Sequence, residues 1–136
     1  MNGLGFALVL GFVMPAAATA QTWQGQIRCA VIPVLNTKPL LGDFVMNEAG
    51  AQLTYSRPVH DADSPMLSGV GETGSGTLTG NAVRLQGGAH AAGYSYTATY
   101  EGSLAGNRAT LTGEQVWIAR KLPRPFHRAC QIDLTR

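Results

Sequence analysis

Apolar and polar residues alternate along much of the chain with a period of two, which is the period of a β-strand rather than of a helix. The clearest run places one set of residues on one face: Tyr94, Tyr96, Ala98, Tyr100, Gly102 and Leu104. The polar residues between them occupy the other face, and similar alternation occurs within residues 23–31, 52–56 and 130–135. One apolar face and one wet face predict antiparallel strands that cover a single core.

Short segments with glycine separate these runs and predict tight turns. They are Glu48-Ala49-Gly50, Gly80-Asn81 and Gly106-Asn107, whose residues tolerate the positive φ that hairpin turns require. Between the turns we expect about eight strands, near residues 22–32, 41–48, 51–57, 73–80, 82–87, 93–105, 108–119 and 126–135. Short connections favour pairing between neighbours, so the predicted fold is all-β, a small up-and-down antiparallel barrel. A β-sandwich is the alternative that the same pattern permits.

The two cysteines are far apart in sequence and predict how the barrel closes. Cys29 lies in the first predicted strand and Cys130 in the last. Behind a secretory leader, an even number of cysteines indicates a disulfide, although separate thiols or a bridge between chains are alternatives. An intramolecular bridge would make the first and last strands near neighbours.

Residues 1–20 have the pattern of a secretory signal peptide. Residues 4–14 are almost continuously apolar, Pro15 follows, and Ala18-Thr19-Ala20 offers the small residues that a signal peptidase reads. Met1-Asn2-Gly3 contains no Lys or Arg, and a buried N-terminal helix is the alternative. We expect residues 21–136 to form a single domain in the periplasm or outside the cell.

Composition and charge exclude several classes of protein. The chain has 136 residues with ten Lys and Arg against eight Asp and Glu, a net charge of +2. This length is typical of one domain, and this charge gives no case for nucleic-acid binding. After residue 20, the chain has no apolar run as long as the roughly 18 residues that a membrane-spanning helix needs. A barrel in the outer membrane would bury Arg28 and Glu101 in a narrow lumen, so we expect no membrane-spanning segment.

Aromatic side chains supply one set of candidate contacts. Tyr94, Tyr96 and Tyr100 lie on one face of one predicted strand, and Trp117 lies on the next. At the mouth of a barrel they would contact a small amphipathic ligand, whereas in its interior they would be core residues. Trp23, in the first predicted strand, is expected to plug one end of the barrel.

Two irregular segments supply a second set. Residues 120–128 contain Arg120, Lys121, Arg124 and Arg128, which would meet an anionic partner or an envelope surface, unless the segment is only a solvated linker. Residues 58–72 form the longest predicted loop and suit protein recognition, or are a plain loop. His60, Asp61 and Asp63 in this loop have no distant partner, so we predict no metal site.

Catalysis has little support in the sequence. It contains no nucleophile elbow, phosphate loop, zincin helix or paired-cysteine motif. The three histidines, His60, His90 and His127, fall in predicted loops or at strand edges. We expect no enzymatic activity and no cofactor.

The chain resembles a group of short secreted bacterial proteins to which no function is assigned. The resemblance lies in Trp23-Gln-Gly25-Gln-Ile27-Arg-Cys29, in the Gly-Asn hairpins and in Cys130-Gln-Ile132-Asp-Leu134. It implies the compartment and the fold, and it transfers no catalytic residue. The architecture is also similar to that of secreted barrels that bind small ligands or inhibit hydrolases, but the ligand contacts of the biotin-binding proteins are missing.

The sequence therefore predicts a secreted, non-enzymatic barrel with two functional interpretations. The preferred one is a protein-interaction or inhibitor-like module that uses residues 58–72 and 120–128. The alternative is a small-ligand-binding barrel with Tyr94, Tyr96, Tyr100 and Trp117 as contacts, which an interior cavity of several hundred Å3 would favour. Outside these two non-enzymatic interpretations, an enzyme of unrecognised type is the third alternative.

Overall fold

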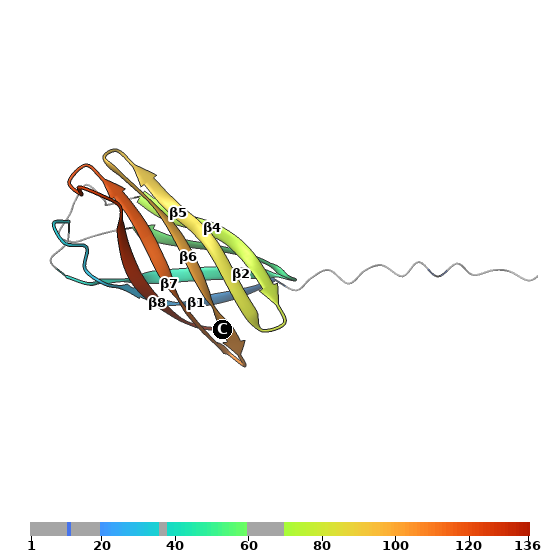
Figure 1. The fold of residues 1–136 in the computed structure, drawn as a ribbon. Helices are drawn as coiled ribbons and strands as arrows, with labels where there is room; N and C mark the ends of the chain where they lie inside the picture. The colour runs from blue at the N-terminus through green and yellow to red at the C-terminus, as the bar shows by residue number, and fades with distance from the viewer. Residues whose placement is uncertain (1–10, 12–19, 36–37, 60–69) are drawn as a thin grey trace, which may run out of the picture.

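A computed structural model describes residues 11, 20–35, 38–59 and 70–136. These residues form eight β-strands and no helix (Figure 1). The strands are β1 (Ala20–Cys29), β2 (Leu40–Ala49), β3 (Gln52–Val59), β4 (Val70–Thr79), β5 (Ala82–Ala91), β6 (Tyr94–Ala105), β7 (Arg108–Ala119) and β8 (Phe126–Thr135). The predicted signal peptide lies outside the described residues, apart from Gly11 and Ala20.

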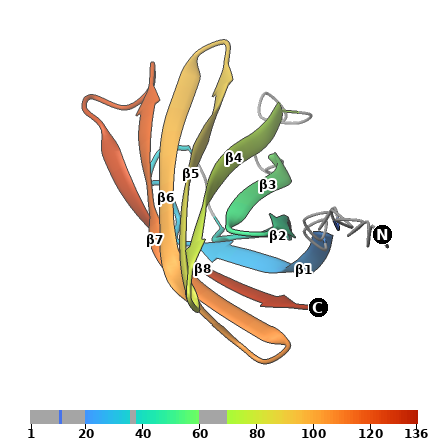
Figure 2. The same cartoon turned by 90° about the vertical axis from the view of Figure 1, so that its right-hand side faces the viewer.

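Each strand pairs antiparallel with its neighbours in sequence, and β1 also pairs with β8, so the sheet is a closed barrel (Figure 2). The predicted up-and-down barrel is thus confirmed, and the sandwich alternative is excluded. Cys29 and Cys130 face each other in the ladder between β1 and β8 and form the predicted disulfide.

The two ends of the barrel differ in their connections. At one end, here called the hairpin end, Gly50, Gly80 and Gly106 take φ values of 62°, 61° and 61° in tight turns. The other, here called the disulfide end, is where β3 ends and β4 begins, and it carries residues 30–35, 38–39, 92–93 and 120–125. Long connections on a rigid barrel are where recognition tends to lie.

The stagger of the strands makes the barrel narrow. Following paired residues once around the sheet from Ala20 leads back to β1 at Arg28, a displacement of eight residues. The intermediate residues are Ala49, Gln52, Thr77, Arg84, Glu101, Thr112 and Gln131. Eight strands with this stagger enclose an interior just wide enough for side chains to fill.

Apolar and aromatic side chains fill most of this interior. Trp23 is fully buried near the hairpin end, where its Nε1 donates to Glu48 Oε2 at 2.9 Å and the Arg136 guanidinium lies over its ring. Farther along, the ring of Phe44 stacks on Tyr55 with centroids 4.9 Å apart and meets Tyr100 edge-on at 6.0 Å. Among the described residues, the fully buried charged and amide side chains lie toward the disulfide end.

Candidate functional site

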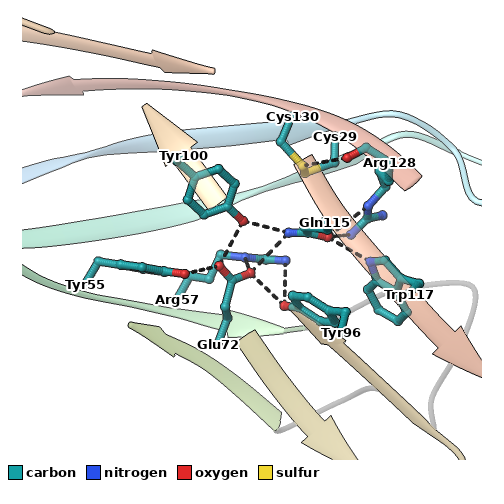
Figure 3. The surroundings of a disulfide bond; sticks show 10 residues. All are labelled: Cys29, Tyr55, Arg57, Glu72, Tyr96, Tyr100, Gln115, Trp117, Arg128 and Cys130. Atoms are coloured by element: carbon teal, nitrogen blue, oxygen red, sulfur yellow. Dashed lines mark hydrogen bonds and ion pairs between the residues drawn. A yellow bond between two sulfur atoms is a disulfide. The ribbon is translucent and has the colours of Figure 1, made fainter. Parts of the chain in front are cut away.

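A cluster of buried polar side chains lies inside the barrel toward its disulfide end (Figure 3). Among the described residues, the buried charged and amide side chains are Arg57 on β3, Glu72 on β4, Gln115 on β7 and Arg128 on β8. Strand alternation turns each of them inward, because each is two residues from another inward-facing position. Charges are rarely buried unless they are paired and hydrogen-bonded, so the burial of these groups depends on their partners.

Glu72 is the acceptor at the centre of the cluster. Its Oε1 accepts from Arg57 Nε at 2.8 Å, from the Tyr96 hydroxyl at 2.7 Å and from Gln115 Nε2 at 3.1 Å. Its Oε2 accepts from the hydroxyls of Tyr55 and Tyr100 at 2.8 and 2.9 Å. A carboxylate offers about four lone-pair sites, and five donors therefore saturate it.

Gln115 connects this carboxylate to the second arginine. Its Nε2 donates to Glu72 and also to the Tyr100 hydroxyl at 2.9 Å. Its Oε1 accepts from Trp117 Nε1 at 3.0 Å and from Arg128 Nε and Nη2 at 3.1 and 2.7 Å. Since donors and acceptors are fixed on both sides, the network determines the orientation of the amide.

Arg128 is buried, and the part of the chain that the structure describes supplies no carboxylate to neutralise it. Only 4% of the residue is exposed, and its guanidinium lies 5.1 Å from the centre of the Trp117 ring. Among the described residues, no carboxylate lies within ion-pairing distance of it. Burial, followed by the nearby charge of Arg57, lowers the pKa of Arg128 to about 10. At neutral pH the guanidinium is still charged.

Tyr94 contributes a hydroxyl group for which the described residues offer no hydrogen-bond partner. The residue is 7% exposed, and its ring stacks on Trp117 with centroids 5.3 Å apart. The hydroxyl oxygen is buried and has no hydrogen-bond partner in the described part of the chain. An unsatisfied buried hydroxyl costs about 1–3 kcal/mol.

The other three tyrosines are bonded and strongly held in their neutral form. Burial first, and then the charge of Glu72, raises the pKa of Tyr55 and of Tyr100 well above the ordinary range. The same two causes raise the pKa of Tyr96. Burial opposes the charge on Arg57, but Tyr96 and Glu72 leave its pKa above the ordinary value.

The structure brings together the aromatic residues that the sequence singled out. Tyr94, Tyr96 and Trp117 form a stack, in which the centroids of Tyr96 and Trp117 are 4.3 Å apart. Tyr100 lies deeper, against Tyr55 and Phe44. All four predicted contacts are buried, so they are core residues of the barrel and also the aromatic lining of the polar cluster.

The basic segment is split by the structure. Arg120, Lys121 and Arg124 are exposed in the connection between β7 and β8. The grouping of Arg128 with them is wrong, because β8 begins at Phe126 and strand alternation turns Arg128 into the barrel. Its neighbour His127 takes the outward position, beside Glu114.

The predicted loop 58–72 is shorter than expected. β3 extends to Val59 and β4 begins at Val70, which places Glu72 in a strand. Residues 60–69, with His60, Asp61 and Asp63, lie outside the described residues.

Sequence reasoning missed Arg57, Glu72 and Gln115. A signal was present, because each continues a period-two series of inward residues. Arg57 follows Leu53 and Tyr55, Glu72 precedes Gly74 and Gly76, and Gln115 lies between Gly113 and Trp117.

The outer face of the barrel has several hollows. One of about 820 Å3 follows β1, β7 and β8 beside the disulfide, and its lining includes Arg28, Ala30, Glu114, His127, Ala129 and Gln131. Another of about 600 Å3 lies over β4–β7, where Arg84 and Glu101 form an exposed ion pair. Neither is the interior cavity that would directly favour a ligand barrel.

Among the described residues, no three His, Cys, Asp or Glu side chains are grouped to hold a metal ion. In the same residues there is no helix with the length and apolar character needed to cross a membrane. The chain matches no family model, no curated protein and no solved structure.

Proposed function

We propose that this protein is a non-enzymatic binding protein that takes up a small amphipathic molecule at the disulfide end of its barrel. The observation that carries the proposal is the Tyr94 hydroxyl, which is buried beside stacked rings and has no partner among the described residues. Few buried polar groups in native proteins lack a partner, and each one calls for an explanation. A ligand group bonded to this hydroxyl would supply it.

The narrow barrel limits how such a molecule can bind. Phe44, Tyr55 and Tyr100 fill the interior below the cluster, so a ligand cannot pass through the centre. It would enter from the disulfide end, with its polar group toward Tyr94 and its apolar part directed outward. The disulfide is consistent with a protein exported to an oxidising compartment, where such a carrier or sensor would act.

Two tyrosine substitutions test this proposal, with anilinonaphthalene sulfonate as a fluorescent probe. Tyr94→Phe keeps the ring and removes the unpartnered hydroxyl, so the protein should become more stable while the probe binds more weakly. Tyr55→Phe removes a hydroxyl that donates to Glu72. This control should become less stable, and its binding of the probe should change little.

The readouts are denaturant unfolding and probe titration on the folded proteins. If Tyr94→Phe gains stability and binds the probe as well as the wild type does, the cluster is only a structural core. Absence of saturable binding to the wild-type protein would also contradict the proposal.

A second function, docking of a protein partner, is favoured by the hollow beside the disulfide. The hollow has a volume of about 820 Å3. Arg120, Lys121 and Arg124 are exposed at the same end of the barrel. Replacing these three cations with glutamine should weaken the binding of such a partner and leave the binding of the probe unchanged. Unchanged binding of the partner after this replacement would contradict docking at the hollow.

A further inference from the structure

We infer that the ligand carries an oxyanion, a carboxylate, sulfonate or phosphate group, and that Arg128 holds it. This inference rests on the proposed function and specifies its chemistry.

The described interior contains one positive charge more than it can neutralise. Arg57 and Arg128 are both buried, and Glu72 is the buried carboxylate among the described residues. Glu72 is paired with Arg57 at 2.8 Å, and both side chains are fully buried. An uncompensated charge in such surroundings is strongly unfavourable. An anion that reached Arg128 would be bound because it would neutralise this charge.

Glu72 has no remaining capacity to pair with Arg128. Its two oxygens already accept three phenolic hydroxyls, one guanidinium N–H and one amide N–H. Gln115 stands between the two groups and presents only its amide oxygen to Arg128. The amide orients the guanidinium without neutralising it.

The guanidinium has donors to spare. It carries five N–H groups in a planar fork, and Gln115 Oε1 accepts from Nε and Nη2. No other hydrogen bond joins it to a described residue. A planar fork with free N–H groups matches the geometry of a carboxylate or a phosphate.

The surroundings favour an anion attached to an apolar or flat body. Trp117 contacts the guanidinium and also stacks with Tyr94 and Tyr96, so the charged group is bordered by aromatic rings. Arg120, Lys121 and Arg124 are exposed at the same end and would attract an anion from solution. A cationic ligand would be repelled by Arg128 and by these three exposed cations.

The experiment compares two probes that share their rings. Anilinonaphthalene sulfonate carries an anionic group, and phenylnaphthylamine has the same ring system without the sulfonate. We expect the wild type to bind the sulfonate at least about tenfold more tightly. Arg128→Met should abolish this preference, while Arg84→Met, at an arginine exposed on the outer face, should preserve it.

Salt provides a second measurement that needs no variant, should Arg128→Met fail to fold. Between about 0.1 and 1 M salt the Debye length falls from about 10 Å to about 3 Å. A sulfonate held by a buried guanidinium should keep most of its preference across this range, whereas one held by exposed cations should lose it.

The failures can be told apart. If both probes bind the wild type equally, the ligand site stands and the anion inference falls. If the preference survives in folded Arg128→Met, or disappears with salt, the anion is held elsewhere and the inference also falls. If neither probe saturates, the proposed function itself is wrong.

Discussion

At the scale of single residues, Glu72 is the group on which the polar interior depends. It accepts hydrogen bonds from side chains on β3, β6 and β7, and it supplies the negative charge that faces Arg57. Breaking a buried pair by removing one partner leaves an uncompensated charge, which costs far more than the net contribution of the intact pair. Exposed pairs lack this property because water solvates the remaining charge.

Glu72→Gln should therefore destabilise the protein by about 3–5 kcal/mol. The matched control is Glu101→Gln, which breaks the exposed pair with Arg84 and should change stability by less than about 1 kcal/mol. The free energy of unfolding in urea measures both. Equal effects of the two substitutions would show that the Arg57–Glu72 pair contributes no more than a surface pair.

At the scale of elements, close approach between strands shapes the barrel. Gly25, Gly76, Gly102 and Gly113 face inward, and a Cβ on any of them would overlap the backbone oxygen of a neighbouring strand. Gly42 also faces the interior, but a Cβ there would meet Arg57 Nη1 at 3.6 Å, an ordinary contact. The difference identifies where neighbouring strands leave no room for a side chain.

We expect Gly113→Ala to destabilise the barrel by about 3 kcal/mol or more, since backbone cannot move aside as a flexible side chain can. Gly42→Ala should fall within about 1 kcal/mol of the wild type. Thermal unfolding followed by circular dichroism measures both. A well-folded Gly113→Ala variant with wild-type stability would contradict the tight packing of β6 against β7.

The disulfide acts at the same scale, because it joins the two strands whose pairing closes the barrel. Its cysteines are 101 residues apart. Replacing both with alanine should cost about 2–5 kcal/mol. Reduced wild-type protein should match this double variant in denaturant unfolding, and an unchanged midpoint in both would show that the strand ladder alone closes the barrel.

At the scale of the whole molecule, the four tyrosines link stability to alkaline pH. All four are buried, and their pKa values are raised, first by burial. In the unfolded chain they lose protons near about pH 10, whereas the folded barrel retains them. The unfolded state then binds fewer protons, so stability falls as the pH rises above about 10.

Arg128 contributes in the opposite direction over part of this range. Its folded pKa of about 10 lies below its ordinary value, so the folded state loses that proton first and gains stability as the pH rises. The pKa values of Tyr55, Tyr96 and Tyr100 are shifted further than that of Arg128, and three such groups act against one. The net effect is alkaline destabilisation.

The expected result is a single alkaline transition in which tyrosinate absorbance and loss of β-sheet signal coincide. Near-ultraviolet absorbance and far-ultraviolet circular dichroism, recorded on the same titration, test this. Tyrosinate forming near pH 10 while the barrel stays folded would contradict the burial of these hydroxyls. Urea-unfolded protein is the control and should titrate at the ordinary tyrosine pKa.

Most of the fold could be predicted from the sequence because its signals are local. The alternation around Tyr96 and Tyr100 is enough to identify β6, and the glycines at positions 50, 80 and 106 mark three turns. Cys29 and Cys130 indicate which strands close the sheet. Strand ends are less certain, and the error at β4 placed Glu72 in a loop.

The candidate site was only half predicted, for a reason that Arg128 illustrates. A positive charge beside other positive charges in sequence suggests a surface segment. The alternation of the strand indicates the interior instead, because Arg128 is two residues from Cys130 and four from Ile132, which face inward. The alternation proved the correct signal, because β8 begins at Phe126 and Arg128 therefore lies within the strand. A short sequence window does not show which of the two signals dominates.

By itself, the sequence determined the number of strands, three of their turns and the alternation of most of them, and its two cysteines indicated which strands lie side by side, since each of these depends on residues that are adjacent or uniquely paired. The tertiary structure decided between barrel and sandwich, and it set the stagger that leaves the interior narrow. It also decided that Arg57, Glu72, Gln115 and Arg128 meet in one network. These four side chains come from β3, β4, β7 and β8, and only closure of the sheet brings β3 and β4 across the interior from β7 and β8.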